Sequence, residues 1–207
     1  MARISDLRFS CLIVSSLLFG AIAVAVVLGL TDNFDAATRA GFNRWASPNL
    51  TMLAEGASFV GSVAFLFTLA ALIAAGLWMG GRPRAALLLL LVMFLAAIVN
   101  NIVKLTFARA RPETFFGIAP DTYSFASGHA LFSACFFSVA AGLIAAHVEK
   151  SWHRAAVWAL ACTIIAGIGL SRVYLGVHHL TDVIAGFALA ALVVCIVRAI
   201  VAEQNQQ

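Results

Sequence analysis

Charged residues are scarce in this 207-residue chain: 11% of its residues are Asp, Glu, Lys or Arg, while 63% are hydrophobic. This composition excludes a water-soluble globular domain, because long apolar surfaces that face water aggregate. The 13 basic residues outnumber the 9 acidic residues but form no cluster or stripe, so we expect no nucleic-acid partner. Lipid is therefore the expected solvent for most of the surface.

Cysteine pairs with the short spacing of metal or redox motifs are also lacking. The four cysteines, Cys11, Cys135, Cys162 and Cys195, all lie inside apolar runs, and we expect them to be small core or lipid-facing residues. There is no low-complexity tract and no clear internal repeat. Because the turns around residues 80–84 and 149–154 are too short to hold a soluble domain, the sequence predicts one membrane domain over residues 1–207.

Apolar runs, in contrast, are abundant. A helix needs roughly 20 residues to cross the hydrocarbon layer, and six runs of about that length lie near residues 9–30, 57–79, 85–107, 128–148, 155–171 and 183–202. Membrane β-strands are only about 10 residues long and alternate in polarity, so the runs favour helices. We expect an all-α bundle of six transmembrane helices, the first being a retained anchor rather than a signal peptide.

Basic residues at the ends of the runs predict the orientation, because they are retained on the cytoplasmic side. With a cytoplasmic amino terminus, seven of them are cytoplasmic: Arg3, Arg8, Arg82, Arg84, Lys150, Arg154 and Arg198. Six face out: Arg39, Arg44, Lys104, Arg109, Arg111 and Arg172. Three of those six belong to the motifs below, and without them the ratio is seven to three. We expect both termini in the cytoplasm.

The segment 31–51 joins the first two runs and mixes charged and apolar residues. It carries Asp32, Asp35, Arg39, Arg44 and Trp45. This pattern is typical of an interfacial amphipathic helix, although helix packing alone would explain its small residues and Trp45.

Ionisable residues near the membrane gather in three segments: KLTFARARP at 104–112, ASGH at 126–129, and SRVYLGVHHLTD at 171–182. Such residues are costly at membrane depth unless they face a polar cavity. With six spans and an inside start, all three segments emerge at the outer face. We therefore expect them to form one site.

Phosphate is the ligand that these side chains suit. Lys104, Arg111 and Arg172 offer three positive charges and many N–H donors. Ser127 and Gly128 lie at a helix start, where free N–H groups attract anions. Arg109 is interpreted instead as an interfacial anchor near the lipid headgroups.

His178 and Asp182 are four residues apart, so the carboxylate can orient one imidazole nitrogen while the other attacks phosphorus. His129 is then available as general acid and later as general base. His129, His178, His179 and Asp182 also have metal-ligand chemistry. The three nearby cations would repel a metal ion, so we expect no metal site.

The complete pattern runs Lys104, six residues, Arg111 and Pro112; then Ser127, Gly128 and His129; then Ser171, Arg172, five residues, His178, three residues and Asp182. It resembles the type 2 phosphatidic acid phosphatase family, whose phosphate-binding architecture is shared with vanadium haloperoxidases and some soluble acid phosphatases. One position departs from the family pattern, since Ala126 replaces the usual proline before Ser127.

The resemblance implies metal-independent hydrolysis without a cofactor. Its nucleophile would be His178, with Asp182 as orienter and His129 as acid and base. Lys104, Arg111, Arg172, Ser127 and Gly128 would bind the phosphate. His179 has the wrong spacing to Asp182 for the nucleophile.

A lipid phosphate or diphosphate is the expected substrate, in the cytoplasmic (inner) membrane with the site facing the periplasm or exterior. The short outer loops suit undecaprenyl diphosphate, while phosphatidylglycerol phosphate, phosphatidic acid and lipid A phosphates remain alternatives. No obligatory protein partner is expected. A proton- or ion-coupled transporter would instead spread polar residues through several spans, and a vanadate-binding haloperoxidase would use the same phosphate site.

Overall fold

A computed structural model of the protein describes residues 2–116 and 120–203, and every regular element in these ranges is a helix. The helices are α1 (Ala2–Val27), α2 (Asp32–Arg44), α3 (Pro48–Val60), α4 (Val63–Met79), α5 (Pro83–Phe107), α6 (Gly128–Ala145), α7 (Ser151–Tyr174) and α8 (Leu180–Glu203). The all-α prediction is confirmed for this part of the chain.

Five helical segments among the described residues are long and apolar enough to cross a membrane: Phe9–Val27, Pro83–Phe107, Gly128–Ala145, Ser151–Tyr174 and Leu180–Val201. The predicted run 57–79 corresponds instead to parts of α3 and α4, which are bent by 46° and pass the same test only as a pair. The predicted count of six therefore depends on treating α3 and α4 as one broken span.

The bend between α3 and α4 has a local cause. Ser62 begins α4, because its Oγ accepts a hydrogen bond from the N–H of Phe65 at 3.3 Å. Gly61 ends α3 against α7, where a Cβ atom would lie only 2.3 Å from Cγ2 of Ile168. The bend lets α3 pack on α7 while α4 packs on α5.

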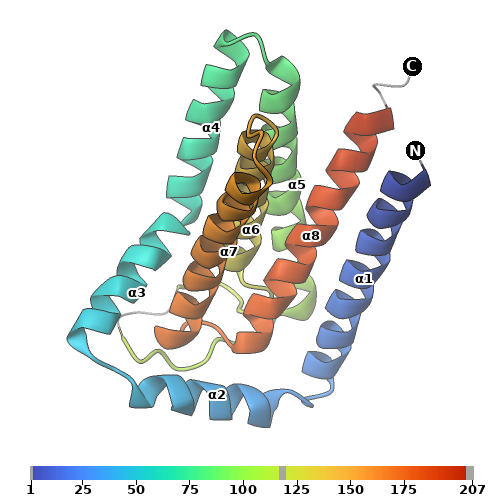
Figure 1. Ribbon diagram of the computed structural model, residues 1–207. Helices are drawn as coiled ribbons and strands as arrows, with labels where there is room; N and C mark the ends of the chain where they lie inside the picture. The colour runs from blue at the N-terminus through green and yellow to red at the C-terminus, as the bar shows by residue number, and fades with distance from the viewer. Residues whose placement is uncertain (1, 117–119, 204–207) are drawn as a thin grey trace.

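The helices form a bundle in which α6 packs against α4, α5, α7 and α8, and α8 packs against α1, α2, α5, α6 and α7 (Figure 1). Helix α1 lies on the outside of the bundle and packs along α8. Helix α2 lies across one end of the bundle, and α1 begins and α8 ends at the opposite end (Figure 1). The helix expected within 31–51 is therefore present, and it covers the end where α5 and α7 finish.

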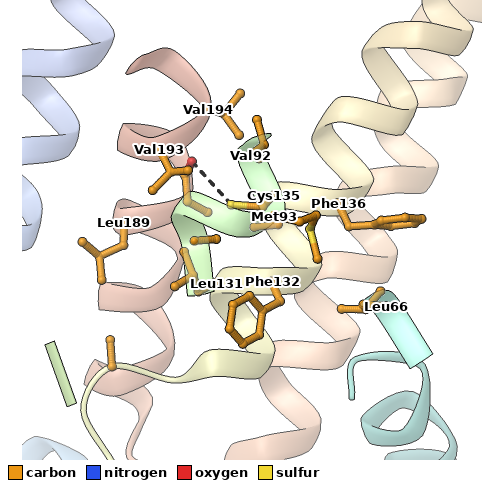
Figure 2. Close-up of a cluster of buried hydrophobic side chains, with 14 of the residues drawn as sticks. Leu66, Val92, Met93, Leu131, Phe132, Cys135, Phe136, Leu189, Val193 and Val194 are labelled. Atoms are coloured by element: carbon orange, nitrogen blue, oxygen red, sulfur yellow. Dashed lines mark hydrogen bonds between the residues drawn. The ribbon is translucent and has the colours of Figure 1, made fainter. Parts of the chain in front are cut away.

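The main core lies where α4, α5, α6 and α8 meet (Figure 2). It contains fully buried apolar side chains from each of these helices, including Leu66, Met93, Leu131, Phe136 and Leu189. Large apolar side chains such as Phe94 and Leu105 are exposed on the outside of the bundle. This distribution fits a protein whose outer surface contacts lipid.

The cysteines differ from expectation in one respect. Cys135 is buried in the core and Cys162 is exposed, as predicted for core and lipid-facing residues. Cys11 and Cys195, however, form a disulfide that joins α1 to α8. Sequence spacing did not indicate this pair, because its partners are separated by 184 residues and meet only through helix packing.

Candidate active site

The three polar segments predicted from the sequence meet at the end of the bundle covered by α2. Lys104 lies in the last turn of α5, His129 in the first turn of α6, and Arg172 in the last turn of α7. The positive charges of Lys104, Arg111 and Arg172 all act on His129. The prediction that the segments share one location is confirmed.

His178 is placed by the turn that ends α7. Gly176 adopts a left-handed conformation (φ 73°), and its N–H donates to the carbonyl of Val173 at 3.0 Å. The N–H groups of Val177 and His178 both donate to the carbonyl of Arg172, at 3.1 and 3.3 Å. These bonds form a Schellman motif, which favours glycine at the left-handed position. A Cβ atom on Gly176 would also lie 2.8 Å from the backbone nitrogen of Phe115.

The contacts of the His178 ring fix its tautomer. Nη1 of Arg111 lies 3.2 Å from Nε2 of His178 and also donates to the carbonyl of Val177 at 2.7 Å. Since a guanidinium can only donate, Nε2 accepts and Nδ1 carries the proton. Nδ1 faces Oδ2 of Asp182 at 3.4 Å, a long contact, and Oγ of Ser124 at 3.3 Å. The Nε2 lone pair is thus on the side of Arg111.

The environment of His178 disfavours its protonated form. The side chain is fully buried, and this burial lowers the pKa of His178 to about 4, with the positive charges of Arg111 and Arg172 acting in the same direction. Asp182 opposes this effect but does not overcome it. His178 is therefore a neutral imidazole near pH 7, with an unprotonated Nε2 that faces Arg111.

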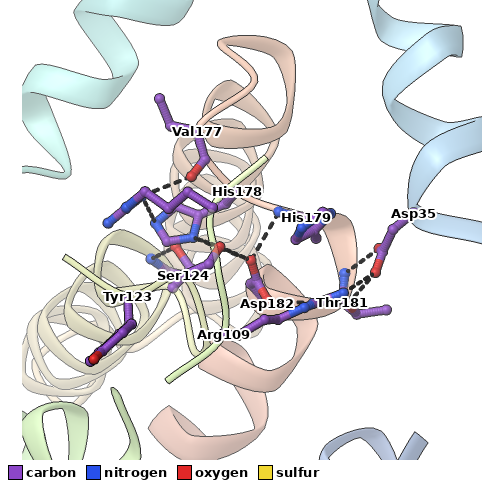
Figure 3. A network of polar contacts seen from close by, with 12 residues as sticks. Asp35, Arg109, Tyr123, Ser124, Val177, His178, His179, Thr181 and Asp182 are labelled. Carbon is purple, nitrogen blue, oxygen red and sulfur yellow. Dashed lines mark hydrogen bonds and ion pairs between the residues drawn. The ribbon is translucent and has the colours of Figure 1, made fainter. Parts of the chain in front are cut away.

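Asp182 is a completely buried carboxylate whose two oxygens both accept hydrogen bonds. Oδ1 accepts from Nη1 of Arg109 at 2.6 Å. Oδ2 accepts from the backbone N–H of His179 at 2.9 Å and from the hydroxyl of Ser124, besides facing His178. Figure 3 shows Asp182 between the His178 ring and Arg109.

The interpretation of Arg109 as an interfacial anchor is wrong. Its side chain is only 12% exposed and pairs with two buried carboxylates, Asp182 at 2.6 Å and Asp35 of α2 at 2.9 Å. It also donates to Oγ1 of Thr181 at 2.9 Å. Burial works against the charged form, but Asp182 and Asp35 together raise the pKa of Arg109 above its ordinary value. Arg109 therefore belongs to the site.

The other three cations surround the His129 and His178 side of the site. Nζ of Lys104 donates to the carbonyl of Tyr123, and Nη1 of Arg172 donates to the hydroxyl of Ser58 in α3. Nε of Arg172 is buried and has no hydrogen-bond partner among the described residues. Burial lowers the pKa of Arg111. Partly desolvated cations of this kind are suited to binding an anion.

A cavity of about 460 Å³ lies beside Arg111, lined by the loop between α5 and α6, including Arg109, Asp121 and Tyr123. Within residues 2–116 and 120–203, no three His, Cys, Asp or Glu side chains are grouped closely enough to hold a metal ion. The donors that face the site are mostly N–H groups, which suit an anionic ligand.

The start of α6 is held against α8. The N–H of Ser127 donates to the carbonyl of Asp182 at 2.9 Å, and its hydroxyl accepts from the N–H of Ala130 at 3.5 Å. The N–H of Ser127 is therefore engaged within the protein, whereas its hydroxyl accepts one long hydrogen bond and can still donate its O–H. The N–H groups of Gly128 and His129 lie in the first turn of α6, where no intrahelical acceptor exists. Of the predicted pair, Gly128 can offer its N–H and Ser127 its O–H to an anion.

Ala126, which stands where the related pattern has proline, is buried, and the peptide bond between Phe125 and Ala126 is cis. His179 contributes its backbone N–H to Asp182. Nδ1 of the His179 ring is buried with no partner in the part of the chain that the structure describes, and burial lowers the pKa of this ring. The ring of His178, not that of His179, faces Asp182.

The sequence analysis missed four residues that contact the site: Asp35, Arg109, Ser124 and Thr181. Two of them were partly indicated by the sequence, because Asp35 is one of only nine acidic residues and Arg109 lies inside the KLTFARARP segment. Their pairing was not visible, since they are far apart in sequence.

We expect the ring of His178 to titrate near pH 4, well below the ordinary histidine value of about 6.5. Its neutral Nδ1–H tautomer should then persist as the pH falls from 7 to 5. ¹⁵N NMR of histidine-labelled protein in detergent would measure this, with His178→Asn to assign the signal. Arg111→Gln should raise the midpoint, because it removes a neighbouring positive charge. A midpoint at or above 6.5 would contradict the buried, neutral ring.

Comparison with known proteins identifies the family of this chain. The family model of the PAP2 superfamily matches residues 85–206, which include all three polar segments. Phosphatidylglycerophosphatase B of Bacillus subtilis (strain 168) is 32% identical over 183 residues, covering 88% of this chain and 90% of that protein. A lipid A 1-phosphatase of Rhizobium johnstonii is 32% identical over 106 residues, covering 46% of this chain and 39% of that protein.

Two crystal structures share the fold. The transmembrane PAP2-type phosphatidylglycerolphosphate phosphatase from Bacillus subtilis matches with a TM-score of 0.85 at 30% identity, covering 92% of this chain and 96% of that chain. LpxE from Aquifex aeolicus matches with a TM-score of 0.57 at 25% identity, covering 78% of this chain and 90% of that chain. The chain is an integral membrane protein that belongs to the PAP2 superfamily and is one of its lipid phosphatases.

Proposed function

We propose that this enzyme hydrolyses a lipid phosphate monoester without a metal ion or cofactor, through a phosphohistidine formed on Nε2 of His178. The observation that carries the proposal is the neutral, buried ring of His178, whose Nε2 lies 3.2 Å from Arg111 while Nδ1 faces Asp182. Nucleophilic catalysis requires this combination of an unprotonated ring nitrogen, a neighbouring phosphate ligand and an orienting group, and a bound phosphate would take the place of Nε2 as acceptor from Arg111.

The first step forms an N–P bond from Nε2 and breaks the bond between phosphorus and the lipid oxygen. His129, in its protonated form, gives its proton to the departing oxygen. The phosphorylated ring keeps its proton on Nδ1 and becomes cationic, so the carboxylate of Asp182 stabilises it. In the second step His129 takes a proton from water, the resulting oxygen attacks phosphorus, and the N–P bond breaks to release phosphate.

Lys104, Arg111 and Arg172 would hold the phosphoryl oxygens, together with the N–H of Gly128. Preorganised donors of this kind stabilise charge that develops in the transition state. Ser127 would fix the start of α6 through its N–H and its accepting hydroxyl oxygen, and its O–H can still donate to a phosphoryl oxygen.

Phosphatidylglycerol phosphate is the substrate that we propose. The enzyme resembles phosphatidylglycerophosphatase B of Bacillus subtilis along nearly its whole length, whereas its match to a lipid A 1-phosphatase covers less than half of the chain. This similarity favours phosphatidylglycerol phosphate over undecaprenyl diphosphate, which the sequence analysis placed first.

In the proposed topology, α3 and α4 form one broken span, six spans cross the inner membrane, and the site faces the exterior. Helix α1 begins and α8 ends at the bundle end opposite α2, as an even number of spans requires (Figure 1). The seven-to-three excess of basic residues near that end supports a cytoplasmic location for it.

Phosphate release from a lipid panel, with excess EDTA, tests substrate and mechanism together. We expect the highest kcat/KM with phosphatidylglycerol phosphate, compared with phosphatidic acid, lipid A and undecaprenyl diphosphate.

His178→Ala should lower kcat/KM by on the order of 10³-fold or more, because the nucleophile is lost. His179→Ala is the matched control, since it keeps the backbone N–H that Asp182 needs. EDTA-resistant release that His178→Ala leaves undiminished would exclude the mechanism, and faster release from undecaprenyl diphosphate would reverse the substrate assignment.

His129→Ala should separate the acid and base steps. With a lipid phosphate, whose alkoxide is a poor leaving group, we expect a loss of roughly 10²–10⁴-fold. With p-nitrophenyl phosphate, whose leaving group needs little protonation, rapid-quench measurement should show a retained burst of p-nitrophenol followed by slow turnover. Equal loss of the burst and of lipid hydrolysis would argue against a proton-transfer role.

The orientation can be tested with single cysteines in intact cells. Asn49→Cys lies at the exposed start of α3, at the site end, and Glu149→Cys lies in the turn at the opposite end. A membrane-impermeant maleimide should label Asn49→Cys directly and Glu149→Cys only after the cells are permeabilised. The reverse pattern would place the site in the cytoplasm.

A further inference from the structure

Two buried carboxylates share the guanidinium of Arg109, although they come from opposite ends of the chain. Nη1 of Arg109 donates to Oδ1 of Asp182 at 2.6 Å, and Nη2 donates to Oδ2 of Asp35 at 2.9 Å. Asp35 is 1% exposed and Asp182 is not exposed at all. Figure 3 shows the line of contacts from Asp35 through Arg109 to Asp182. A buried charge is costly unless it is paired, and here each of the two buried carboxylates is paired with the same guanidinium.

Asp35 also holds the residue next to Asp182. Its Oδ1 accepts from the N–H of Thr181 at 3.1 Å, and its Oδ2 accepts from the hydroxyl of Thr181 at 2.6 Å. Thr181 and Asp182 lie in the first turn of α8. One side chain of α2 thus fixes both the cation that binds Asp182 and the backbone that carries it.

The charges explain why a second carboxylate is useful. Arg109 alone would neutralise Asp182 and weaken its attraction for a cationic His178. With Asp35 present, two negative charges surround one positive charge, so the group keeps a net negative charge. In addition, Arg109 occupies Oδ1 of Asp182, which leaves Oδ2 for His178, Ser124 and the His179 N–H.

We propose that Asp35, on the helix that crosses the end of the bundle, is a positioning residue that acts through Arg109 to orient Asp182 and to preserve its negative charge. The inference rests on the proposed role of Asp182 as the partner of His178. Helix α2 is then part of the catalytic apparatus rather than only a surface element.

Asp32 provides a matched control on the same helix. It lies one turn before Asp35, and its carboxylate is 3.9 Å from the same guanidinium, but its side chain is 74% exposed. An exposed pair at this distance contributes little. Asp32→Asn removes the same charge from the same helix and should change kcat and KM by less than about twofold.

The main experiment is a double-mutant cycle of Asp35→Asn and Arg109→Gln, with phosphate release from phosphatidylglycerol phosphate as the assay. The amide oxygen that Asp35→Asn introduces can still accept from the N–H of Thr181, but a neutral amide cannot balance the charge of Arg109. We expect Asp35→Asn to lower kcat roughly tenfold or more, with KM changed by less than about threefold, because the phosphate ligands are untouched. In the Arg109→Gln background, Asp35→Asn should have almost no further effect, since the two residues act in series.

The fall of kcat/KM at low pH, its acid limb, distinguishes the positioning role of Asp35 from a purely structural role. The charged and titratable groups around the His178–Asp182 pair are Arg109, Arg111, Arg172, Lys104, His129 and His179, with Asp35 and Asp32 behind Arg109. Removing Asp35 leaves the positive charges less balanced, so protonation of His178 becomes harder and the acid limb should move to lower pH. If Asp35→Asn instead loosened and hydrated the site, the acid limb would move to higher pH, toward the ordinary pKa of histidine.

Several outcomes would overturn the proposal: Asp35→Asn within twofold of wild type, a double variant whose loss equals the product of the single losses, or an acid limb that moves upward. If Asp35→Asn does not fold, judged by thermal unfolding in detergent, Arg109→Lys is used instead. It keeps the cation but lacks the planar fork that reaches both carboxylates, so kcat should again fall tenfold or more. A normal kcat in Arg109→Lys would likewise overturn the proposal.

His178→Asn and Asp182→Asn are measured in parallel to separate the two hypotheses. If both abolish phosphate release while Asp35→Asn is normal, the inference about α2 fails and the proposed mechanism stands. If His178→Asn or Asp182→Asn retains full activity, the proposed mechanism fails, and the inference fails with it.

Discussion

The buried negative charge of Asp182 is the constraint on which the rest of the site depends. A carboxylate with no solvent exposure would cost several kcal/mol if unpaired, so donors must reach both of its oxygens. They come from three places: Arg109 and Ser124 in the loop after α5, the backbone of His179, and the His178 ring. Because Arg109 also pairs with Asp35, the same network joins α2 to this end of the bundle.

The membrane limits where this chemistry can occur. Five apolar helices and the α3–α4 pair leave little room for polar groups at mid-depth, so the ionisable side chains lie toward the ends of the bundle, and those of the candidate site share one end. There α6 begins, α5 and α7 end, and their first N–H groups and last side chains converge on one volume. Helix termini are the natural place for an anion site in a helical membrane protein, since their backbone donors are free.

Positive charge exceeds negative charge on the side of the site where phosphate would bind. Lys104, Arg111 and Arg172 lie near a neutral His178, and Nε of Arg172 is buried without a partner from residues 2–116 or 120–203. A phosphate group would supply both the missing negative charge and the missing acceptors. On the opposite side of the His178 ring, Asp182, Arg109 and Asp35 carry a net negative charge that suits a cationic phosphohistidine. In the proposed mechanism, the imidazole therefore lies between a region that would bind the anion and a region that would stabilise the cation.

By itself the sequence determined the all-helical class, the lengths of most spans, the end of the bundle that holds the chemistry, and the positions of His129, His178, Lys104, Arg111 and Arg172. These features are local, because apolar length, residue type and short spacing are read along one segment. Only the tertiary structure decided that α3 and α4 are separated by a bend, that Cys11 meets Cys195, and that Arg109 joins Asp35 to Asp182. Each of these features depends on which distant segments pack together. A pattern along one sequence does not show which residue pairs with a buried charge.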